Sequence, residues 1–243
     1  MARKRRGLGA LLLALGLGSA AQAWTLLVPS NHSLPLAEVQ GSEVKRGILV
    51  ELGQALAREL SQPVRFVVRP SRRVGEALRK GEADLLCYAL PEWIDGEFQW
   101  TQAVIPNAAV IAARRDSPAI RQLSDLANRS VGTVLGYRHL EMDQPLGAQF
   151  QRSDALDMQG NLAKLAARRT DFAITDRLTL QHLNHRHTEW ALEERLVMRP
   201  FEAACALSPR SQLNIQTLRL ALRKLQSQGQ LDRLLQPRSA APS

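Results

Sequence analysis

The sequence is poor in three features that often reveal a protein's class: cysteine, aromatic residues and long apolar segments. It has two cysteines among 243 residues, 5% aromatic residues, and a single long apolar segment, which lies near the N-terminus. Two cysteines are too few for a small disulfide scaffold and too far apart for a zinc knuckle. One apolar segment excludes a multi-pass membrane protein. Because 45% of the residues are hydrophobic, the chain is also not a disordered polyelectrolyte.

Signals for catalysis, metal binding and nucleic-acid binding are also scarce. The sequence has no Gly-x-Ser-x-Gly nucleophile motif. His182, His185 and His187 are not spaced to share one helical face, so we expect a solvated helix end there rather than a metal site. The basic pairs lack the interleaved aromatic residues that favour nucleic-acid binding. We therefore expect no metal, no cofactor and no nucleic-acid partner.

The first 23 residues have the organisation of a cleaved signal peptide. A basic start from Arg3 to Arg6 precedes the apolar segment 7–20, and Ala21-Gln22-Ala23 has the small-x-small pattern of a cleavage site. The alternative is an N-terminal anchor. Cleavage removes four basic and no acidic residues, so the net charge falls from +9 to +5, an ordinary charge for solubility. We expect a mature chain that begins at Trp24 and resides in the periplasm.

After this segment, strand-like and helix-like patterns alternate. Leu49, Leu52 and Leu56 recur at helical spacing, and the β-branched stretch around Val67 is typical of a strand. The expected order is strand 24–28, helix 47–60, strand 64–68, helix 71–80 and strand 83–90. This order is typical of a mostly parallel sheet that is covered by helices.

The same pattern then recurs. We expect a strand over 131–135, a turn into a helix near residue 138, a second helix capped by Asn161, a strand over 171–175 and a helix to about 183. Leu78 precedes Asp84 by the same interval as Leu165 precedes Asp171, which indicates two similar α/β units with a cleft between them. The alternative is a chance likeness within one larger sheet. A strand over 199–207 and a helix from 215 to about 229 should pack back on one lobe.

Four segments of the chain, in their order, resemble the bacterial extracellular solute-binding proteins of family 3, the polar amino acid type. They are Leu78-x-x-Gly81-Glu-Ala-Asp84 to Trp93; Leu123-x-x-Leu126 to Gly136-Tyr137; Leu165-x-x-Arg168-Arg-x-Asp171 to Asp176; and the last helix, which runs through Gly229. The resemblance covers nearly all of the mature chain. It implies an α/β, type II periplasmic-binding-protein fold of two lobes, with the ligand cleft between them.

The resemblance also implies how the chain divides. Lobe I would comprise residues 24–104 and 199–243, and lobe II residues 105–198. The chain would then cross between the lobes twice, near Ile105-Pro106 and near Met198-Arg199.

In amino-acid binders of this family, an Arg on lobe I holds the ligand's carboxylate and an Asp on lobe II takes its ammonium. Asp176 matches the acidic residue, because it directly follows the expected strand 171–175. The Arg is missing, and Trp93 or Ile94 stands in its place. A Trp offers a flat π surface and one N–H donor, and it carries no charge to pair with a carboxylate. Arg73 or Arg138 could supply the positive charge instead; the alternative for both is a solvated helix end.

Other candidate ligand-binding residues follow the expected strands. Tyr88 and Trp93 could form an aromatic wall beside Asp176, which would suit an amine-bearing ligand; core packing is the alternative. Gly136 and Tyr137 lie between a strand and a helix, where free N–H groups can hold an anion, or where a plain tight turn can form.

Cys87 and Cys205 fall on two expected strands of lobe I. In an oxidising compartment they could form a disulfide, or they could remain two buried thiols. The sequence leaves both possibilities open.

The resemblance implies a periplasmic receptor that closes on a small polar ligand, an amino acid or an amine, and delivers it to an ABC permease or a membrane sensor. We expect this receptor to be a monomer. One alternative is a dehydratase-like enzyme on the same fold, with Glu92 or Asp176 as its carboxylate of raised pKa. The other is an accessory protein with a degenerate cleft.

Overall fold

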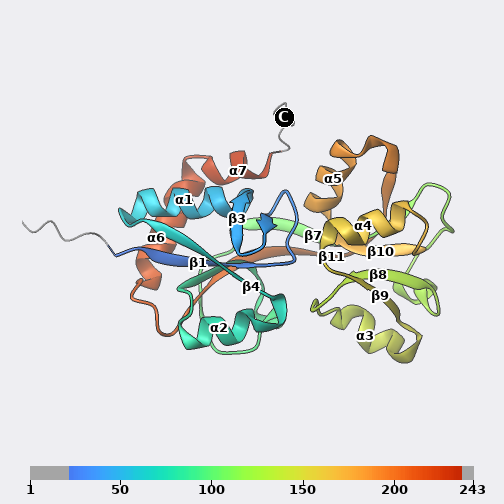
Figure 1. The fold of residues 1–243 in the computed structure, drawn as a ribbon, viewed down its shortest axis with the longest axis horizontal. Coiled ribbons are helices and arrows are strands. Elements are labelled where there is room, and N and C mark those ends of the chain that lie inside the picture. Colours follow the sequence, from blue (N-terminus) through green and yellow to red (C-terminus); the bar gives the residue numbers. More distant parts are fainter. Residues whose placement is uncertain (1–21, 237–243) are drawn as a thin grey trace, which may run out of the picture.

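The fold was obtained as a computed structural model, which describes residues 22–236. The expected signal peptide, 1–23, lies almost entirely outside the described residues. Within the described range, no helix has the length and apolar character needed to cross a membrane. Two lobes lie side by side, and two long strands run between them (Figure 1).

The first lobe is built on a parallel sheet. Its central strand β1 (Trp24–Pro29) pairs with β4 (Val64–Arg69) on one side and with β5 (Leu85–Ala89) on the other. A short hairpin, β2 (Glu38–Gln40) with β3 (Glu43–Arg46), connects β1 to the first helix.

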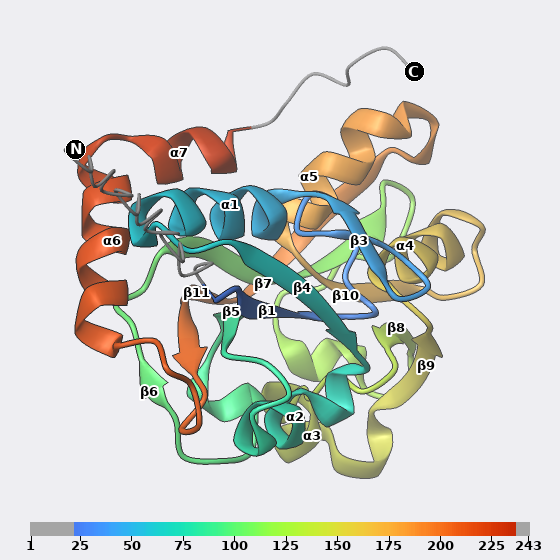
Figure 2. The same ribbon diagram turned by 60° about the vertical axis from the view of Figure 1, so that its left-hand side comes forward.

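Helices cover both faces of this sheet. On one face lie α1 (Ile48–Leu60), α6 (Ile215–Ser227) and α7 (Gln230–Leu235), and on the other lies α2 (Val74–Lys80) (Figure 2). The periodic leucines of α1 are buried with those of α6 in one apolar cluster, so the amphipathic pattern places them in the core as expected. The C-terminal helices therefore pack on the first lobe.

The second lobe repeats this plan. Strand β8 (Ser130–Val134) pairs in parallel with β9 (Gln151–Ala155) and with β10 (Phe172–Asp176). Its helices are α3 (Leu140–Leu146), α4 (Met158–Ala166) and α5 (Arg177–Arg186). Buried side chains from both faces of the sheet form two apolar clusters, one under α3 and one under α4 and α5.

Two antiparallel strands join the lobes. β7 (Ile105–Arg114) and β11 (Leu192–Leu207) pair along most of their lengths, and β11 continues into the first sheet, where it pairs with β5 and with the short β6 (Gln99–Trp100). The strand order is β4-β1-β5-β11-β7-β10-β8-β9. A continuous sheet connection therefore joins the two lobes (Figure 1).

Three local expectations were wrong or incomplete. The C-terminal strand starts at Leu192 rather than at 199, and β7 and β9 were not expected from the sequence. Asn161 does not cap α4: Asp157 does, by accepting a hydrogen bond from the Gly160 N–H at 2.7 Å. Asn161 instead lies within α4, where its buried side chain donates to the Ile174 carbonyl at 2.9 Å. This hydrogen bond connects α4 to β10.

The two cysteines form a disulfide. Cys87 on β5 and Cys205 on β11 are paired residues of neighbouring antiparallel strands, with their Cα atoms 4.0 Å apart. Of the two possibilities that the sequence left open, the structure contains the bonded one. The bond links β5, the strand that carries Tyr88, to β11, the strand that crosses between the lobes.

Candidate ligand-binding site

A cavity of about 140 Å³ lies between the lobes. Strand ends of both lobes meet there, as is usual for ligand sites in open α/β folds. Six of the seven residues singled out from the sequence line it: Tyr88, Trp93, Gly136, Tyr137, Arg138 and Asp176. Arg73 does not line it, and its side chain is exposed.

Aromatic rings form one wall of the cavity. The Trp93 ring centroid is 6.0 Å from that of Tyr88 and 5.1 Å from that of Phe201. Phe201, on β11, was not expected to contribute, because its segment carries no motif. The three rings contact one another edge-on or tilted, which is the favoured geometry for aromatic pairs.

Tyr88 is held in an unusual backbone conformation. Its φ is +60°, a left-handed value that a bulky residue rarely adopts. Such a conformation costs about 1–3 kcal/mol and persists only where the surrounding structure imposes it. Here the disulfide fixes the preceding residue, Cys87, and the strained turn directs the Tyr88 ring into the cavity wall.

Asp176 ends β10 and caps α5. Its carboxylate accepts hydrogen bonds from the Thr179 N–H at 3.0 Å and from the Thr179 hydroxyl at 2.7 Å. Burial raises the pKa of this carboxyl above its usual value, although these hydrogen bonds oppose the shift. The cap fixes the carboxylate at the edge of the cavity.

Asn107, on β7, links Asp176 to the aromatic wall. Its side-chain N–H₂ group donates to Asp176 Oδ1 at 2.8 Å and to the Tyr88 hydroxyl at 2.7 Å. Its Oδ1 accepts from the Leu178 N–H at 3.2 Å. Nothing in the local sequence marks this residue, because only the pairing of β7 with β10 places it beside Asp176.

The arginines of the cavity wall are already paired. Arg138 forms a two-pronged ion pair with Asp95, one contact of which is 2.9 Å. Arg199 contacts Glu92 at 2.7 Å. Neither guanidinium is therefore free to replace the missing carboxylate-binding Arg. Arg72, rather than Arg73, reaches the second lobe.

Arg72 belongs to a second, outer hollow of about 690 Å³ at the cavity mouth. A Cβ built on Gly136 would lie 3.1 Å from Arg72 Cγ, so the arginine stem covers this turn of the second lobe. Gly136 itself has φ +91°. The Tyr137 N–H bonds to the Val134 carbonyl at 3.1 Å, and is thus used by the tight turn rather than free to hold an anion.

Two histidines that the sequence analysis did not single out also line the cavity. His32 follows β1 and His139 precedes α3. In both rings the Nε2 atom is buried and has no hydrogen-bond partner among the described residues. Burial lowers both pKa values to about 4, so both rings are neutral at pH 7. Tyr137, from the other lobe, has its hydroxyl 3.3 Å from His32 Nδ1.

The buried histidines predict acid sensitivity. Because their pKa values lie below the usual 6.5, the unfolded chain takes up protons first as the pH falls. Each histidine should therefore lower the unfolding free energy by about 1 kcal/mol between pH 6.5 and 5.5. In urea unfolding at these two pH values, His139→Gln should lose about 1 kcal/mol less than the wild type. Equal losses would contradict a buried, neutral His139.

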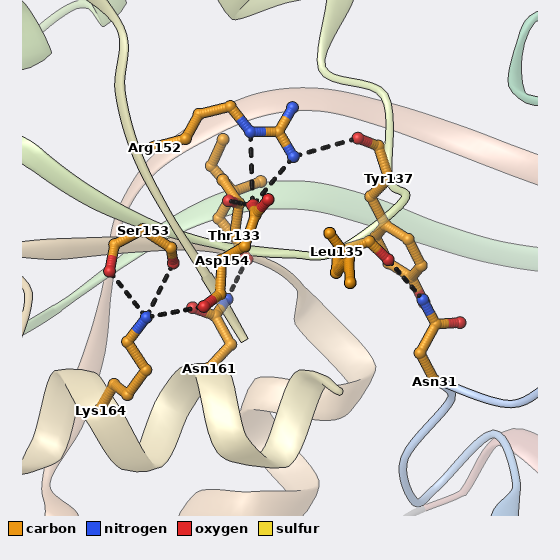
Figure 3. A network of polar contacts seen from close by, with 10 residues as sticks. Asn31, Thr133, Leu135, Tyr137, Arg152, Ser153, Asp154, Asn161 and Lys164 are labelled. Atoms are coloured by element: carbon orange, nitrogen blue, oxygen red, sulfur yellow. Dashed lines mark hydrogen bonds and ion pairs between the residues drawn. The ribbon is translucent and has the colours of Figure 1, made fainter. Parts of the chain in front are cut away.

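Direct contacts close the mouth of the cleft. Asn31 of the first lobe donates to the Leu135 carbonyl of the second at 3.0 Å (Figure 3). The Gln159 N–H donates to Ser33 Oγ at 3.0 Å. With the pair between Arg138 and Asp95, these contacts hold the two lobes in a closed arrangement.

The turn that carries Leu135 and Tyr137 is itself supported from within the second lobe. Figure 3 shows Arg152 between the Asp154 carboxylate, 3.1 Å away, and the Tyr137 carbonyl, 3.3 Å away. Lys164 donates to Ser153 from the neighbouring helix. These contacts within the second lobe support the turn on its cleft side.

The histidine cluster at the end of α5 lies outside the cavity. His187 stacks on Trp190 with ring centroids 4.2 Å apart, and its Nδ1 is 3.3 Å from Glu189. Within residues 22–236, no group of three or more His, Cys, Asp or Glu side chains is arranged to hold a metal ion.

In comparisons of sequence, no protein-family model and no curated protein matches the chain. In comparisons of structure, solved proteins do match. Solved structures match with TM-scores of 0.69 to 0.74 at sequence identities of 14% to 19%.

Three of these structures differ in role. The amino acid ABC transporter substrate-binding protein AbpA of Streptococcus pneumoniae, bound to L-arginine, matches with TM-score 0.72 and 18% identity, over 88% of this chain and 93% of that one. A histidine kinase sensor domain similar to periplasmic binding proteins matches with TM-score 0.72 and 19% identity, over 88% and 95%. The ancestral amino acid-binding protein AncCDT-1, a precursor of cyclohexadienyl dehydratase, matches with TM-score 0.70 and 16% identity, over 87% and 93%. This chain thus has the two-lobe fold of the periplasmic binding proteins.

Proposed function

We propose that the protein is a periplasmic solute receptor of the family 3 type, which closes its lobes on a small polar ligand, an amino acid or an amine. The observation that carries the proposal is the enclosed cavity between the lobes, where a capped carboxylate, Asp176, lies beside an aromatic wall. A cavity lined by both lobes is complete only when the lobes are closed, so a ligand inside it favours the closed state.

The proposed hinge lies where the chain crosses between lobe I (24–104 and 199–243) and lobe II (105–198). Both crossings fall on the paired strands β7 and β11. The register of this pair shifts between Val197 and Arg199, and such irregularities bend strands locally. These features support a hinge in which two strands flex together.

The closed form would be what a membrane partner recognises. An ABC permease and a membrane sensor are both compatible with the fold, since the structural neighbours include a transporter's binding protein and a kinase sensor domain. Export through the signal peptide 1–23 and a monomeric state belong to the same proposal. It fits this proposal that β1 begins at Trp24, immediately after the expected cleavage site.

We favour a receptor over an enzyme. Of the two carboxylates that an enzyme could use, Glu92 lies outside the cavity lining and is paired with Arg199. Burial raises the pKa of Glu92, but hydrogen bonds from its own backbone and from Arg199 outweigh this and lower it overall. Asp176 has a raised pKa, yet its hydrogen bonds are those of a helix cap. The aromatic-lined cavity, which side chains leave unfilled, also argues against a degenerate cleft.

A thermal-shift screen of the mature protein against amino acids, amines and polyamines tests the receptor proposal. A true ligand at 100 times its Kd stabilises by about 2.7 kcal/mol, which is on the order of 5–10 °C for a chain of this size. The control is Ala109→Leu, which fills the cavity from β7. If no compound shifts the wild type, or if the shift persists in the filled variant, the proposed function is wrong.

A further inference from the structure

The unpaired charge inside the cavity is negative. Arg138 and Arg199 are neutralised by Asp95 and Glu92, which lie outside the lining. The two carboxylates of the lining differ: Asp176 has only neutral hydrogen-bond donors, and Glu141 makes no hydrogen bond or ion pair with another described residue. A ligand carboxylate would meet no free cation here and two like charges, which is unfavourable in a partly desolvated site.

The rings beside Asp176 suit a positive charge. Tyr88, Trp93 and Phe201 line the cavity together, and the faces of such rings attract cations, most strongly where water is excluded. Asp176 accepts three hydrogen bonds, whereas an ionised carboxylate has about four acceptor sites. The carboxylate therefore keeps capacity for a ligand's ammonium group.

The cavity lining also includes a neutral ring, His32, one nitrogen of which no other described residue uses. Nδ1 of His32 faces the Tyr137 hydroxyl, while Nε2 is buried and unpartnered. Buried polar atoms are nearly always hydrogen-bonded in folded proteins, so the unpartnered Nε2 makes the His32 ring a candidate partner for a polar group of the ligand. A hydroxyl group fits either tautomer of the ring, because a hydroxyl both donates and accepts.

The volume of the cavity limits the size of the ligand that it can hold. The cavity measures about 140 Å³, and an engineered cavity of about 150 Å³ accommodates benzene. A ligand that fits the closed cavity therefore has about six or seven non-hydrogen atoms. A longer ligand, such as arginine, would have to extend into the outer hollow at the cavity mouth.

We propose that the cleft binds a small cationic amino alcohol: a positively charged head against Asp176 and the aromatic wall, a hydroxyl at His32, and no carboxylate. The inference rests on the proposed receptor function and names its ligand class. The family resemblance implies a ligand with both an ammonium group and a carboxylate. This cavity differs, because Asp176 can accept a ligand's positive charge, whereas both arginines of the lining are already paired and leave none for a ligand's carboxylate.

Calorimetry with choline and three close analogues tests each part. Choline should bind; 3,3-dimethyl-1-butanol, which replaces its charged nitrogen by carbon, should bind at least about thirtyfold more weakly. Ethyltrimethylammonium, which lacks the hydroxyl, and glycine betaine, which has a carboxylate instead, should both bind more weakly than choline. Ethanolamine in a parallel titration distinguishes a primary from a quaternary head, and tighter binding of either compound supports the class.

Two variants assign the contacts. Trp93→Leu should weaken choline binding by about tenfold, whereas Trp190→Leu, which removes a Trp outside the cavity, should not. His32→Phe should weaken choline but leave ethyltrimethylammonium unchanged, because only the hydroxyl contact is lost.

Two results would overturn the inference. One is that neither choline nor ethanolamine binds; the other is that a standard α-amino acid binds more tightly than both. In the second case the receptor proposal stands and only the ligand class is wrong. If nothing in the wider amine and amino-acid screen binds either, the receptor proposal falls as well.

Discussion

Asp176→Asn should weaken the binding of a cationic ligand by at least about thirtyfold, measured by calorimetry with the tightest-binding amine of the screen. The substitution keeps the size of the side chain, removes its charge and replaces one acceptor oxygen by an N–H₂ donor, which the Thr179 hydroxyl can accept. Losing one partner of a desolvated charge pair costs about 2–5 kcal/mol, because the ligand's cation is then buried without compensation.

The fold should survive this change. Asn is as good a helix cap as Asp, so its side-chain oxygen can still accept from the Thr179 N–H at the start of α5. We expect the unfolding free energy to change by no more than about 1 kcal/mol. Glu141→Gln is the matched control, since it removes a carboxylate that no other described residue engages, and its effect on affinity should be smaller. Unchanged affinity in Asp176→Asn would refute the charge-pair interpretation of this site.

Removing the disulfide by Cys87→Ala with Cys205→Ala should lower the unfolding free energy by about 2–5 kcal/mol. The two residues are 118 positions apart, so the bond restricts a large part of the unfolded chain. For a chain of this size the midpoint of thermal unfolding should fall by about 10 °C. Calorimetry of the oxidised wild type, the reduced wild type and the double variant measures this.

The same substitution should also affect the cleft. Tyr88, the residue after Cys87, has a strained left-handed conformation, and the disulfide is one of the constraints that hold it there. Ligand affinity should therefore fall in the double variant even at temperatures where it is fully folded. The reduced wild type provides the control, because it lacks the bond but keeps both side chains. Identical midpoints for the oxidised and reduced proteins would contradict a structural role of the bond.

The sequence predicted the parts of the fold that depend on local pattern. The leucines of α1 and α6 recur at helical spacing and are buried as expected. Asp176 ends a buried strand, and its position at the cavity edge follows from that strand's direction. The two-lobe fold expected from the family resemblance is confirmed by the structural matches.

What the sequence did not reveal depends on contacts between distant segments. Asn107 becomes part of the site only because β7 pairs with β10, and Phe201 only because β11 continues into the first lobe. Arg72 and Arg73 are adjacent and alike in type, so only the backbone direction after β4 decides which of them faces the second lobe. Arg138 was a candidate partner for a ligand carboxylate, but its guanidinium is paired with Asp95 across the cleft.

The strand order ends in two outer strands, β4 and β9, one at each end of the sheet. The outer strand of a sheet carries unpaired backbone groups that can recruit strands of other chains and so begin aggregation. Here both edges display charge: Arg65 on β4 and Arg152 and Asp154 on β9 are exposed. Another chain that added to either edge would have to desolvate these groups. The charged outer strands thereby disfavour edge-to-edge association of the folded protein with other chains.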